Sequence, residues 1–544
     1  MKTLIGAAIG SCVHVSGLYH FLKLAEAEGY KTESLGPAVP VSRLIKIICE
    51  RKPDIVALSY RLTPEAAAEI FNDLKVALRN AGLEGIRMIF GGTPPVAAEA
   101  VKSGLFERVF EGTEPVEEIK RYLRGRSVSD EKILYPDNLV ERIEQKYPYP
   151  LIRHHFGRPT IEETVEGAAL IAEAGVLDVL SLGPDQNAQE HFFHPEEMDH
   201  SQDGAGGVPL RKPEDLEAIY KATRRGNFPL VRCYAGTRDL IKWAEMSVKT
   251  INNAWGAIPL TWYSMLDGRS KRPIPEAIRE NQEVMRWYAE RGIPVEVNES
   301  HQWSLRDAHD ALAVAMAFLA AYNAKKAGVK FYVSQYMFNT PPGTSAAMDI
   351  AKMLAKNEMI EELIDNDFKV FRQVRAGLAH LSPEPSIAMG QLAASAVISL
   401  ALKPHILHVV GYSEGDHAIM ADELIQSCNI IHGVLRNVLY GMPEMTIDSK
   451  VQERKNELKS EAKVLLNELW RRGEGKSEDP WADAINIYNA IKTGLLDTPH
   501  FQGVPYLCGK IITRIIDGAC CAIDRETGEK LSEQERIEKL NYKP

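Results

Sequence analysis

Apolar runs and amphipathic stretches alternate along the first 124 residues. The run from Leu4 to Ile9 is typical of a strand buried in a parallel sheet, and an amphipathic stretch typical of a helix follows it. We expect strands at 3–10, 30–36, 54–60, 86–91 and 107–110, and helices at 16–28, 41–51, 64–81, 95–104 and 114–124. This order predicts an α/β domain with a doubly wound parallel sheet.

A second alternating series begins near Pro150. We expect strands at 151–154, 177–183, 229–235, 256–263, 293–299, 329–336, 368–375 and 404–411, with helical stretches such as 161–175, 276–292, 305–327 and 345–357 between them. Strand–helix units in this number and order predict a (β/α)8 barrel of the TIM type. The polar, proline-flanked segment before them predicts a linker with one or two helical turns. The predicted domains are 1–124, the linker 125–150, the barrel 151–445 and a helical and α+β extension 446–544.

The composition is that of a soluble protein with more than one domain: 544 residues, 45% hydrophobic and 25% charged. A net charge of −10 argues against a general nucleic-acid binder, which needs a basic face. No apolar run reaches about 18 residues, so we expect no membrane span. The seven cysteines form no Cys-x-x-Cys pair, which argues against a disulfide framework and a structural zinc site and fits a reducing cytoplasm.

Small residues and one histidine follow the expected strands of the first domain. His14 and Gly17 come after the first strand, Ser59 lies at the end of the third, and Gly91-Gly92-Thr93 ends the fourth. The carboxyl ends of parallel strands meet at one edge, where open α/β sheets bind ligands. A histidine at that edge is either a metal ligand or a polar residue that satisfies its loop.

This spacing resembles the cobalamin-binding domain of base-off/His-on enzymes, whose motif is Asp-x-His-x-x-Gly, then a serine at a strand end, then Gly-Gly. The matching tract here is Cys12-Val13-His14-Val15-Ser16-Gly17. The resemblance implies a flavodoxin-like fold and makes His14 the lower ligand of the cobalt. It also implies a cofactor-binding set that consists of Cys12, His14, Gly17, Ser59, Gly91, Gly92, Thr93, Gly112 and Thr113.

Cys12 is a departure from that family, which has aspartate at this position. A carboxylate behind a ligating histidine orients the ring and raises its basicity. Without the carboxylate, either the bond between cobalt and His14 is weaker or another group takes its part.

The residues MKTLIGAAIGSC also resemble a bacterial lipoprotein signal that ends at Cys12. Their apolar run is at or below the lower length limit of such a signal. The alternation of strand and helix continues beyond it without a break, which favours a strand.

In a barrel of this type, catalytic side chains come from the carboxyl ends of the strands. These ends carry Arg153-His154-His155, Asp185-Gln186-Asn187, Arg232, Tyr234, Glu299-Ser300-His301, Gln335-Tyr336, Arg372, Arg375, Glu414, Asp416 and His417. Arginines there either bind a carboxylate or phosphate of the substrate, or pair with acids at the rim. The histidine spacing indicates no second metal site. The candidate catalytic residues are Arg232, Tyr234, Glu299, His301 and His417.

The second half of the chain resembles the catalytic subunit of glutamate mutase (methylaspartate mutase). The resemblance is clearest at 416–419, 440–443 and from 495 to 510. The first domain is similar to the small cobalamin-binding subunit of that family, including Arg108-Val109-Phe110 and Gly112-Thr113. The chain therefore looks like the two subunits fused, with the small subunit first.

The resemblance implies an adenosylcobalamin-dependent isomerase. In that family the cofactor lies base-off between the two domains, a deoxyadenosyl radical abstracts a substrate hydrogen, and the substrate radical rearranges. The cofactor carries this chemistry and the protein positions it. The family also implies a homodimer and a reactivating chaperone as partners.

The same comparison limits the substrate. The family arginine of the third strand aligns near Tyr234, with Arg232 two residues away on the same face of the strand, and the family glutamate aligns near Ala254. The predicted substrate is therefore a small carboxylic or amino acid other than glutamate, with a single carboxylate. Three alternatives stay open: a corrinoid methyltransferase, for which no zinc thiolate pattern or helical cap is seen, an aminomutase that also uses pyridoxal phosphate, and a non-catalytic cobalamin-binding protein.

Overall fold

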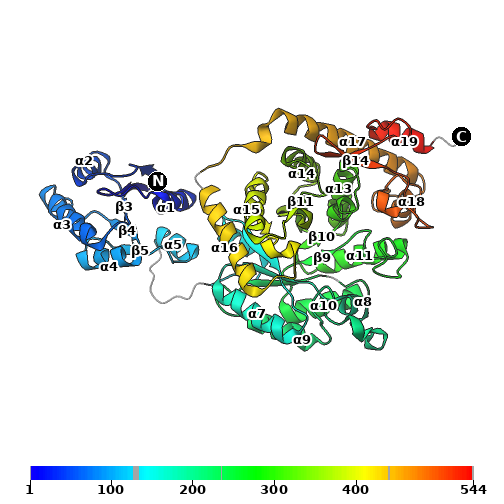
Figure 1. Cartoon of the computed structure of the whole chain (residues 1–544), viewed down its shortest axis with the longest axis horizontal. Helices are drawn as coiled ribbons and strands as arrows, with labels where there is room; N and C mark the ends of the chain where they lie inside the picture. Colours follow the sequence, from blue (N-terminus) through cyan, green and yellow to red (C-terminus); the bar gives the residue numbers. More distant parts are fainter. Residues whose placement is uncertain (1, 126–133, 235, 439–440, 542–544) are drawn as a thin grey trace. The chain divides into compact units, whose positions relative to one another are not determined.

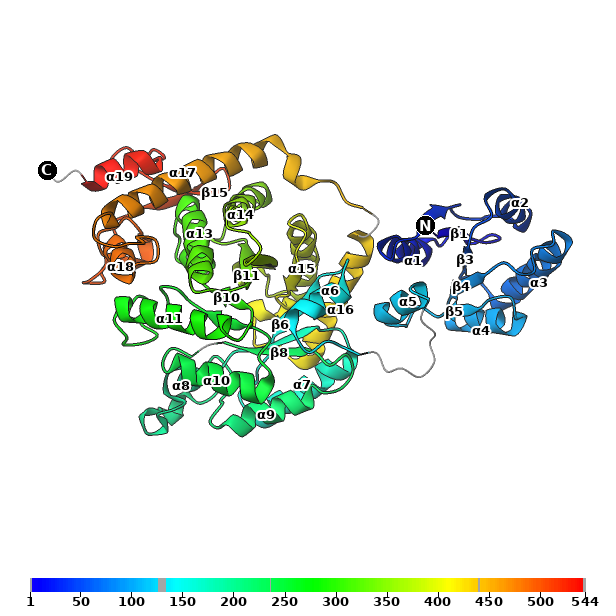
Figure 2. The same cartoon turned by 180° about the vertical axis from the view of Figure 1, so that it is seen from behind.

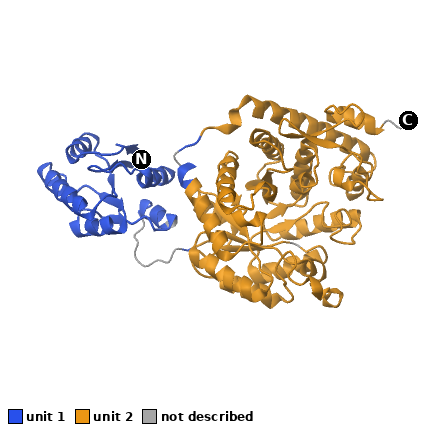
Figure 3. Cartoon of the chain, viewed as in Figure 1, with its two compact units in different colours: residues 1–134, 435–442 blue, residues 135–434, 443–544 orange. Residues whose placement is uncertain are grey.

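The computed structural model describes residues 2–125, 134–234, 236–438 and 441–541. The chain divides into two compact units, which are drawn in different colours in Figure 3. Unit 1 consists of 1–134 and 435–442, and unit 2 of 135–434 and 443–544. Residues 126–133 of the predicted linker and Tyr440 lie outside the described residues.

Unit 1 contains a parallel sheet with the strand order β2-β1-β3-β4-β5 (Figure 1). Its strands are β1 (Thr3–Ala8), β2 (Lys31–Ser34), β3 (Ile55–Tyr60), β4 (Met88–Gly92) and β5 (Arg108–Phe110). Its helices are α1 (Ser16–Ala27), α2 (Val41–Arg51), α3 (Pro64–Asn80), α4 (Pro94–Ser103) and α5 (Val116–Leu123). The prediction of a doubly wound sheet is confirmed.

The central strands of this sheet are apolar because both of their faces are covered. β1 pairs with β2 on one side and with β3 on the other, and every residue of β3 is buried. Helix α3 begins where local chemistry predicts it, since the Thr63 hydroxyl accepts a hydrogen bond from the Ala66 N–H at 3.3 Å and Pro64 occupies the first turn. The strand ends are therefore fixed, and the loops after them meet at the carboxyl edge.

Unit 2 contains eight parallel strands in the order β8-β7-β6-β13-β12-β11-β10-β9, a nearly closed barrel that confirms the prediction (Figure 2). The strands are β6 (Leu151–His155), β7 (Val179–Leu182), β8 (Leu230–Cys233), β9 (Gly256–Ile258), β10 (Val295–Val297), β11 (Phe331–Phe338), β12 (Lys369–Ala376) and β13 (Ile406–His408). Helix α6 (Leu139–Lys146) precedes β6. The remaining helices are α7 (Ile161–Ala174), α8 (Gln186–His191), α9 (Pro213–Ala222), α10 (Leu240–Ile251), α11 (Ile274–Ala289), α12 (Ser300–Ser304), α13 (Asp310–Lys326), α14 (Ala346–Glu361), α15 (Pro385–Leu400) and α16 (Ala421–Val438). Among the described residues, no helix is both long enough and apolar enough to cross a membrane.

The interior of the barrel is apolar near the amino-terminal ends of its strands. Leu139 and Ile143 of α6 pack in one cluster with residues from the amino-terminal parts of the strands, namely Leu151, Val179, Leu230, Val333 and Ile406. Side chains two residues further along a strand point to the same side, one layer closer to the carboxyl end. The apolar cluster thus closes the amino-terminal end of the barrel and leaves the next layer to carry polar groups.

The carboxyl-terminal extension packs along the outer surface of the barrel helices. It comprises α17 (Ser449–Gly473), α18 (Ala484–Lys492), the antiparallel strands β14 (Thr513–Ile516) and β15 (Ala519–Ala522), and α19 (Glu533–Asn541). Helix α17 lies along α13 and α14 (Figure 1). Helix α13 is buried on nearly every side, which explains its apolar sequence around the full turn.

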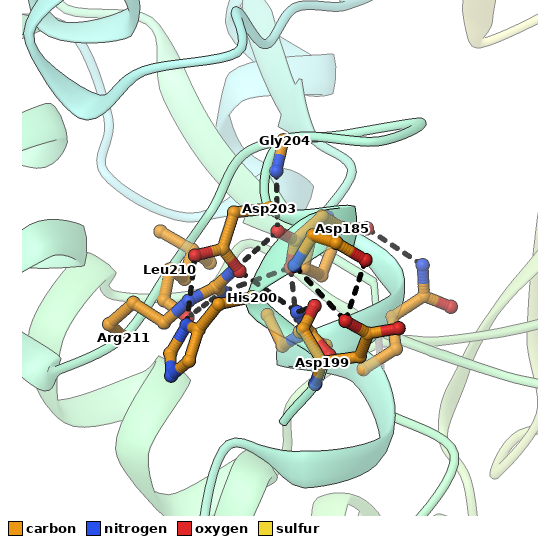
Figure 4. A network of polar contacts seen from close by, with 12 residues as sticks. Asp185, Asp199, His200, Asp203, Gly204, Leu210 and Arg211 are labelled. Atoms are coloured by element: carbon orange, nitrogen blue, oxygen red, sulfur yellow. Dashed lines mark hydrogen bonds and ion pairs between the residues drawn. The ribbon is translucent and has the colours of Figure 1, made fainter. Parts of the chain in front are cut away.

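A folded insertion follows β7 at the carboxyl end of the barrel (Figure 4). The buried carboxylate of Asp185 accepts hydrogen bonds from the N–H groups of Ala188 (2.8 Å) and Gly204 (2.9 Å) and from both terminal nitrogens of Arg211 (3.0 and 2.6 Å). Asp203 pairs with Arg211 as well and accepts from Nδ1 of His200 at 3.1 Å. Asp185, one of the polar residues expected at the strand ends, therefore organises this insertion, which also includes short 3₁₀ turns at Pro195–Glu197 and His200–Gln202.

One buried carboxylate fastens the extension to the barrel. Asp310 accepts hydrogen bonds at 3.1 Å from Arg454 of α17 and from the N–H of Cys520 in β15, and it lies 3.1 Å from Nζ of Lys352 in α14. Removal of this charge would leave two buried cations short of a partner. We expect Asp310→Asn to lower the free energy of unfolding by about 3–5 kcal/mol in urea denaturation.

The matched control is Asp365→Asn. Asp365 also pairs with a lysine, Lys325 at 2.7 Å, but Asp365 is exposed and Lys325 is partly exposed, so its loss should cost less than about 1 kcal/mol. Equal effects of the two substitutions would contradict the fastening role of Asp310.

Candidate functional site

Seven of the nine predicted cofactor-binding residues line one pocket at the carboxyl edge of the sheet in unit 1. They are His14, Gly17, Ser59, Gly91, Gly92, Thr93 and Gly112. They lie at the carboxyl ends of β3 and β4 or in the segments that follow β1, β4 and β5, as the geometry of a parallel sheet requires. Of the other two, Cys12 is buried next to the pocket residue His14, and Thr113 is exposed beside Gly112.

His14 lies in the turn between β1 and α1 with an exposed side chain. Its Nδ1 is 3.8 Å from the sulfur of Cys12. Cys12 is held in place, because its N–H donates to the carbonyl of Ile9 at 3.3 Å and its carbonyl accepts from Ala38 at 2.8 Å. When Nδ1 carries the hydrogen, it faces the sulfur, and the lone pair of Nε2 is left for a metal ion.

The rest of the pocket fits a long polar group such as the detached nucleotide tail of cobalamin. The Ser59 hydroxyl is buried and has no hydrogen-bond partner among the described residues. A Cβ added to Gly17 or Gly91 would have no atom within 4 Å, so both glycines leave open space. A Cβ on Gly92 would lie 2.9 Å from the carbonyl oxygen of Tyr60, so only glycine is accommodated there. An unpaired hydroxyl beside a slot without side chains is what such a ligand would complete.

The barrel of unit 2 contains a polar layer built from alternate strands. Arg153 of β6, Arg232 of β8, Glu296 of β10 and Gln373 of β12 are all completely buried. One oxygen of Glu296, Oε2, lies 3.4 Å from Arg153 and 3.2 Å from Arg232, and accepts the indole N–H of Trp255 at 2.6 Å. Burial alone would raise the pKa of Glu296, but the charges of Arg232 and Arg153 hold it below its ordinary value. The layer therefore carries two cations against one anion.

Aromatic and imidazole rings form the next layer toward the carboxyl end. The Tyr234 hydroxyl donates to Nε2 of His155 at 2.9 Å, and the two rings stack with centroids 5.0 Å apart. His408 meets His155 edge-on at 4.7 Å. Burial, followed by the charge of Arg153, holds the pKa of both histidines well below the ordinary value, so both rings are neutral at neutral pH.

Several buried polar atoms of the barrel interior have no hydrogen-bond partner among the described residues. We call them open atoms: Nε and Nη1 of Arg232, Oε1 of Glu296, both amide atoms of Asn298, Oε1 of Gln335, Nε2 of Gln373 and Nδ1 of His408. Buried polar groups are almost always paired, so a cluster of open ones marks a place for a ligand or for ordered water.

Residues 2–120 match the family model of the B12 binding domain. Unit 1 holds a B12-binding domain. A novel cobalamin-binding protein from Desulfitobacterium hafniense DCB-2 is 27% identical over 23% of this chain and 59% of that chain, with a TM-score of 0.21. This chain thus covers less than two thirds of that protein.

Two further solved structures resemble larger parts of the chain. A Rubisco-like protein from Rhodopseudomonas palustris is 9% identical over 57% of this chain and 70% of that chain, with a TM-score of 0.33. The cobalamin-dependent S-adenosylmethionine radical enzyme OxsB is 12% identical over 80% of this chain and 56% of that chain, with a TM-score of 0.19. These low TM-scores leave the function of the barrel open.

The structure brings two of the five candidate catalytic residues together, Arg232 and Tyr234, with the guanidinium 4.2 Å from the ring centre. Glu299 is buried elsewhere: its carboxylate accepts from the N–H groups of Leu260 (2.9 Å) and Thr261 (3.0 Å), which fastens the loop after β9. The catalytic role of Glu299 stays a prediction.

The two histidines among the catalytic candidates differ in their surroundings. Burial lowers the pKa of His301 to about 3, so this residue is neutral. His417 is exposed and pairs with Asp416 at 2.9 Å and with Glu423 at 3.0 Å, which corresponds to the alternative of a salt bridge at the rim.

Sequence reasoning missed Glu296 and Asn298. The alternation in Val295-Glu296-Val297-Asn298 places both polar residues on one face of β10, opposite the two valines. This alternation of apolar and polar residues could have identified them, because a strand of this barrel turns one face to the interior and the other to the helices. It was obscured by Glu299, a third polar residue that follows Asn298 directly and lies beyond the end of the strand at Val297.

Substitution of His14 tests the cobalt ligand. We expect His14→Ala to weaken cobalamin binding at least about tenfold and to abolish the nitrogen superhyperfine splitting in the EPR spectrum of the bound Co(II) form. His200→Ala, which removes a histidine on the surface, should change neither property. Unchanged splitting in the His14 variant would show that another group ligates the metal.

Substitution of Cys12 tests the departure from the family motif. A carboxylate at this position would accept the Nδ1 hydrogen of His14 more strongly than a thiol sulfur does. We expect Cys12→Asp to tighten cobalamin binding by about tenfold relative to Cys12→Ala, measured by absorbance titration of variants whose circular dichroism matches the natural protein. Weaker binding by the folded Asp variant than by the Ala variant would contradict this view of Cys12.

Proposed function

We propose that the chain is an adenosylcobalamin-dependent radical isomerase, a carbon-skeleton mutase that acts on a small carboxylic or amino acid other than glutamate. The family match of residues 2–120 and the fit of the pocket around His14 support the use of cobalamin. When bound, adenosylcobalamin supplies radical chemistry that protein side chains do not provide. The tasks left to this chain are to bind the acid, orient it and exclude water.

The observation that carries the proposal is the positive layer inside the barrel. Arg153 and Arg232 share the single carboxylate of Glu296, and all three side chains are removed from solvent. An excess positive charge in a medium of low dielectric attracts an anion much more strongly than it would in water. A small carboxylate is the simplest group that neutralises this layer.

The neutral histidines favour radical chemistry over acid–base chemistry. A general acid or base works best when its pKa is close to the operating pH. His155 and His408 have pKa values held far below that range by burial, so they contribute hydrogen bonds without a readily transferred proton. A rearrangement that moves hydrogen atoms rather than protons suits such a site.

The thiols of the barrel argue against methyl transfer of the zinc thiolate type. Cys233 and Cys428 are completely buried, and burial raises the pKa of Cys233 to about 12 and that of Cys428 still further. Among the described residues, neither belongs to a group of His, Cys, Asp and Glu side chains close enough together to hold a metal ion. This observation favours the isomerase over the methyltransferase alternative.

The experiment that tests the proposal is absorbance and EPR spectroscopy of the purified protein incubated with adenosylcobalamin in the dark. We expect base-off binding, nitrogen superhyperfine splitting in the Co(II) form and, after addition of the right small acid, a signal from an organic radical coupled to Co(II). Arg232→Lys should keep the cobalamin spectrum and lose the substrate-dependent signal, because Arg232 belongs to the barrel.

Other outcomes would separate the alternatives. Demethylation of methylcobalamin by a thiol acceptor would establish the methyltransferase. Cobalamin binding without any radical signal across a panel of small acids would leave a non-catalytic binder. A borohydride-sensitive absorbance near 410 nm would reveal bound pyridoxal phosphate and so favour the aminomutase.

A further inference from the structure

Two buried arginines of the barrel differ in how completely they are paired. Arg153 uses all three of its nitrogens: Nε donates to Ser181 at 2.7 Å, Nη1 contacts Glu296 and Gln373, and Nη2 donates to His155 at 3.3 Å. Arg153 is therefore a structural member of the polar layer.

Arg232 has only one hydrogen-bond partner among the described residues. Its Nη2 donates to Glu296 at 3.2 Å, whereas Nε and Nη1 are open atoms although the side chain is completely buried. Its other contacts are the ring faces of Tyr234 and Trp255, with the guanidinium carbon 4.2 and 5.5 Å from the ring centres. A buried N–H without a partner is costly, so this guanidinium is prepared for an acceptor that is not part of the chain.

An open acceptor lies on the same carboxylate that Arg232 already contacts. Oε2 of Glu296 holds both arginines and Trp255, while the second oxygen of the same carboxylate, Oε1, has no partner among the described residues. Asn298, two residues further along the same face of β10, offers both a free donor and a free acceptor. Arg232 thus offers donors and Glu296, 3.2 Å from it, offers an acceptor, and Asn298 adds an unpaired amide two residues beyond Glu296.

The charges that face this position sum to a net positive value. The positive charges are those of Arg153, Arg232 and the half-buried Arg375, which lies one layer closer to the carboxyl end. The negative charge is that of Glu296. His155, His301 and His408 are neutral because burial lowers their pKa values. A ligand that meets Arg232 in this layer would therefore need a negative charge at that end.

We propose that the barrel lumen binds a small carboxylate that carries a hydroxyl or amino group on the neighbouring carbon. The carboxylate accepts from Nη1 of Arg232, the neighbouring group donates to Oε1 of Glu296, and the Asn298 amide completes the contacts. Calling this ligand the substrate rests on the proposed function, whereas its binding does not.

A second carboxylate on the same ligand has no matching place in this layer. Among the described residues, Arg232 is the only completely buried arginine of the lumen with open nitrogens. Arg375 donates through Nε to the carbonyl of Ala376 at 3.1 Å and is not fully buried. The geometry therefore points to a ligand with one carboxylate.

The test is isothermal titration of the full chain, without and with adenosylcobalamin, against a set of three-carbon probes and the four-carbon acid malate. Lactate and alanine carry the carboxylate and a neighbouring donor, propionate lacks the donor, lactamide lacks the charge and malate has a second carboxylate. We expect lactate or alanine to bind, propionate to bind about 10-fold more weakly, and lactamide and malate about 100-fold more weakly. The better of lactate and alanine identifies the neighbouring group as hydroxyl or amino.

Three variants locate the binding. Arg232→Lys should lose about 10- to 100-fold in affinity, and Glu296→Gln should reduce the preference for lactate or alanine over propionate. The matched control is Arg142→Lys, which removes another buried guanidinium, one that donates to the carbonyls of Asn227 and Phe228 at 3.2 and 2.9 Å. Thermal melting of each variant establishes that it is folded, and Asn298→Ala provides a further test without any change of charge.

The outcomes separate this inference from the proposed function. Binding of the three-carbon acids without any cobalamin spectrum would uphold the lumen site and reject the cobalamin-dependent reaction. Normal cobalamin binding with no acid bound would overturn the lumen site. Equal affinity for lactate, propionate and lactamide, or unchanged affinity in folded Arg232→Lys, would overturn it as well.

Discussion

The pairing of two arginines with one glutamate inside a barrel is the constraint on which unit 2 depends. Removing an ion from water costs several kcal/mol, so each charge must meet its partners at close range. The partners of Arg153 come from β7, β10 and β12, and those of Arg232 from β10, so the polar layer forms only when strands far apart in sequence curve into one wall. The apolar layer below, closed by α6, keeps water from reaching these charges from the amino-terminal end. The fold and the charge cluster therefore require each other.

Most of the architecture could be predicted from the sequence because parallel strands covered on both faces are written as apolar runs. The same rule explains where the prediction of the site stopped. Glu296 and Glu299 are three residues apart, and both are buried. β10 ends at Val297, so Glu296 belongs to the strand and meets two arginines, whereas Glu299 accepts backbone N–H groups of the preceding loop. The position at which β10 ends decides which of the two glutamates faces the interior. The ends of strands are the features that the hydrophobic pattern of a sequence predicts least well.

The pocket of the B12-binding domain was easier to predict because it depends on local chemistry. His14 and Cys12 are two residues apart in one turn, and Ser59, Gly91 and Gly92 end neighbouring strands whose register is set by the sheet. Much of this pocket is made by the absence of side chains, which a sequence shows directly as glycine. The barrel site is made by contacts between long side chains, and no single segment of the sequence contains such a contact.

The two sites also differ in what they can select. A slot lined by glycines and one unpaired hydroxyl accepts a large, elongated group with little selectivity for its chemical groups. In the proposed function the barrel distinguishes among small acids, and the residues along and directly after β8 decide how it does so. In the resemblance to glutamate mutase, a substrate arginine aligns with Tyr234; here Tyr234 stacks on His155, and the free guanidinium belongs to Arg232, one layer further from the carboxyl end. A carboxylate must pass the tyrosine to reach its partner. The carboxylate of the proposed ligand would then meet Arg232, one layer away from the position at which the resemblance would place it.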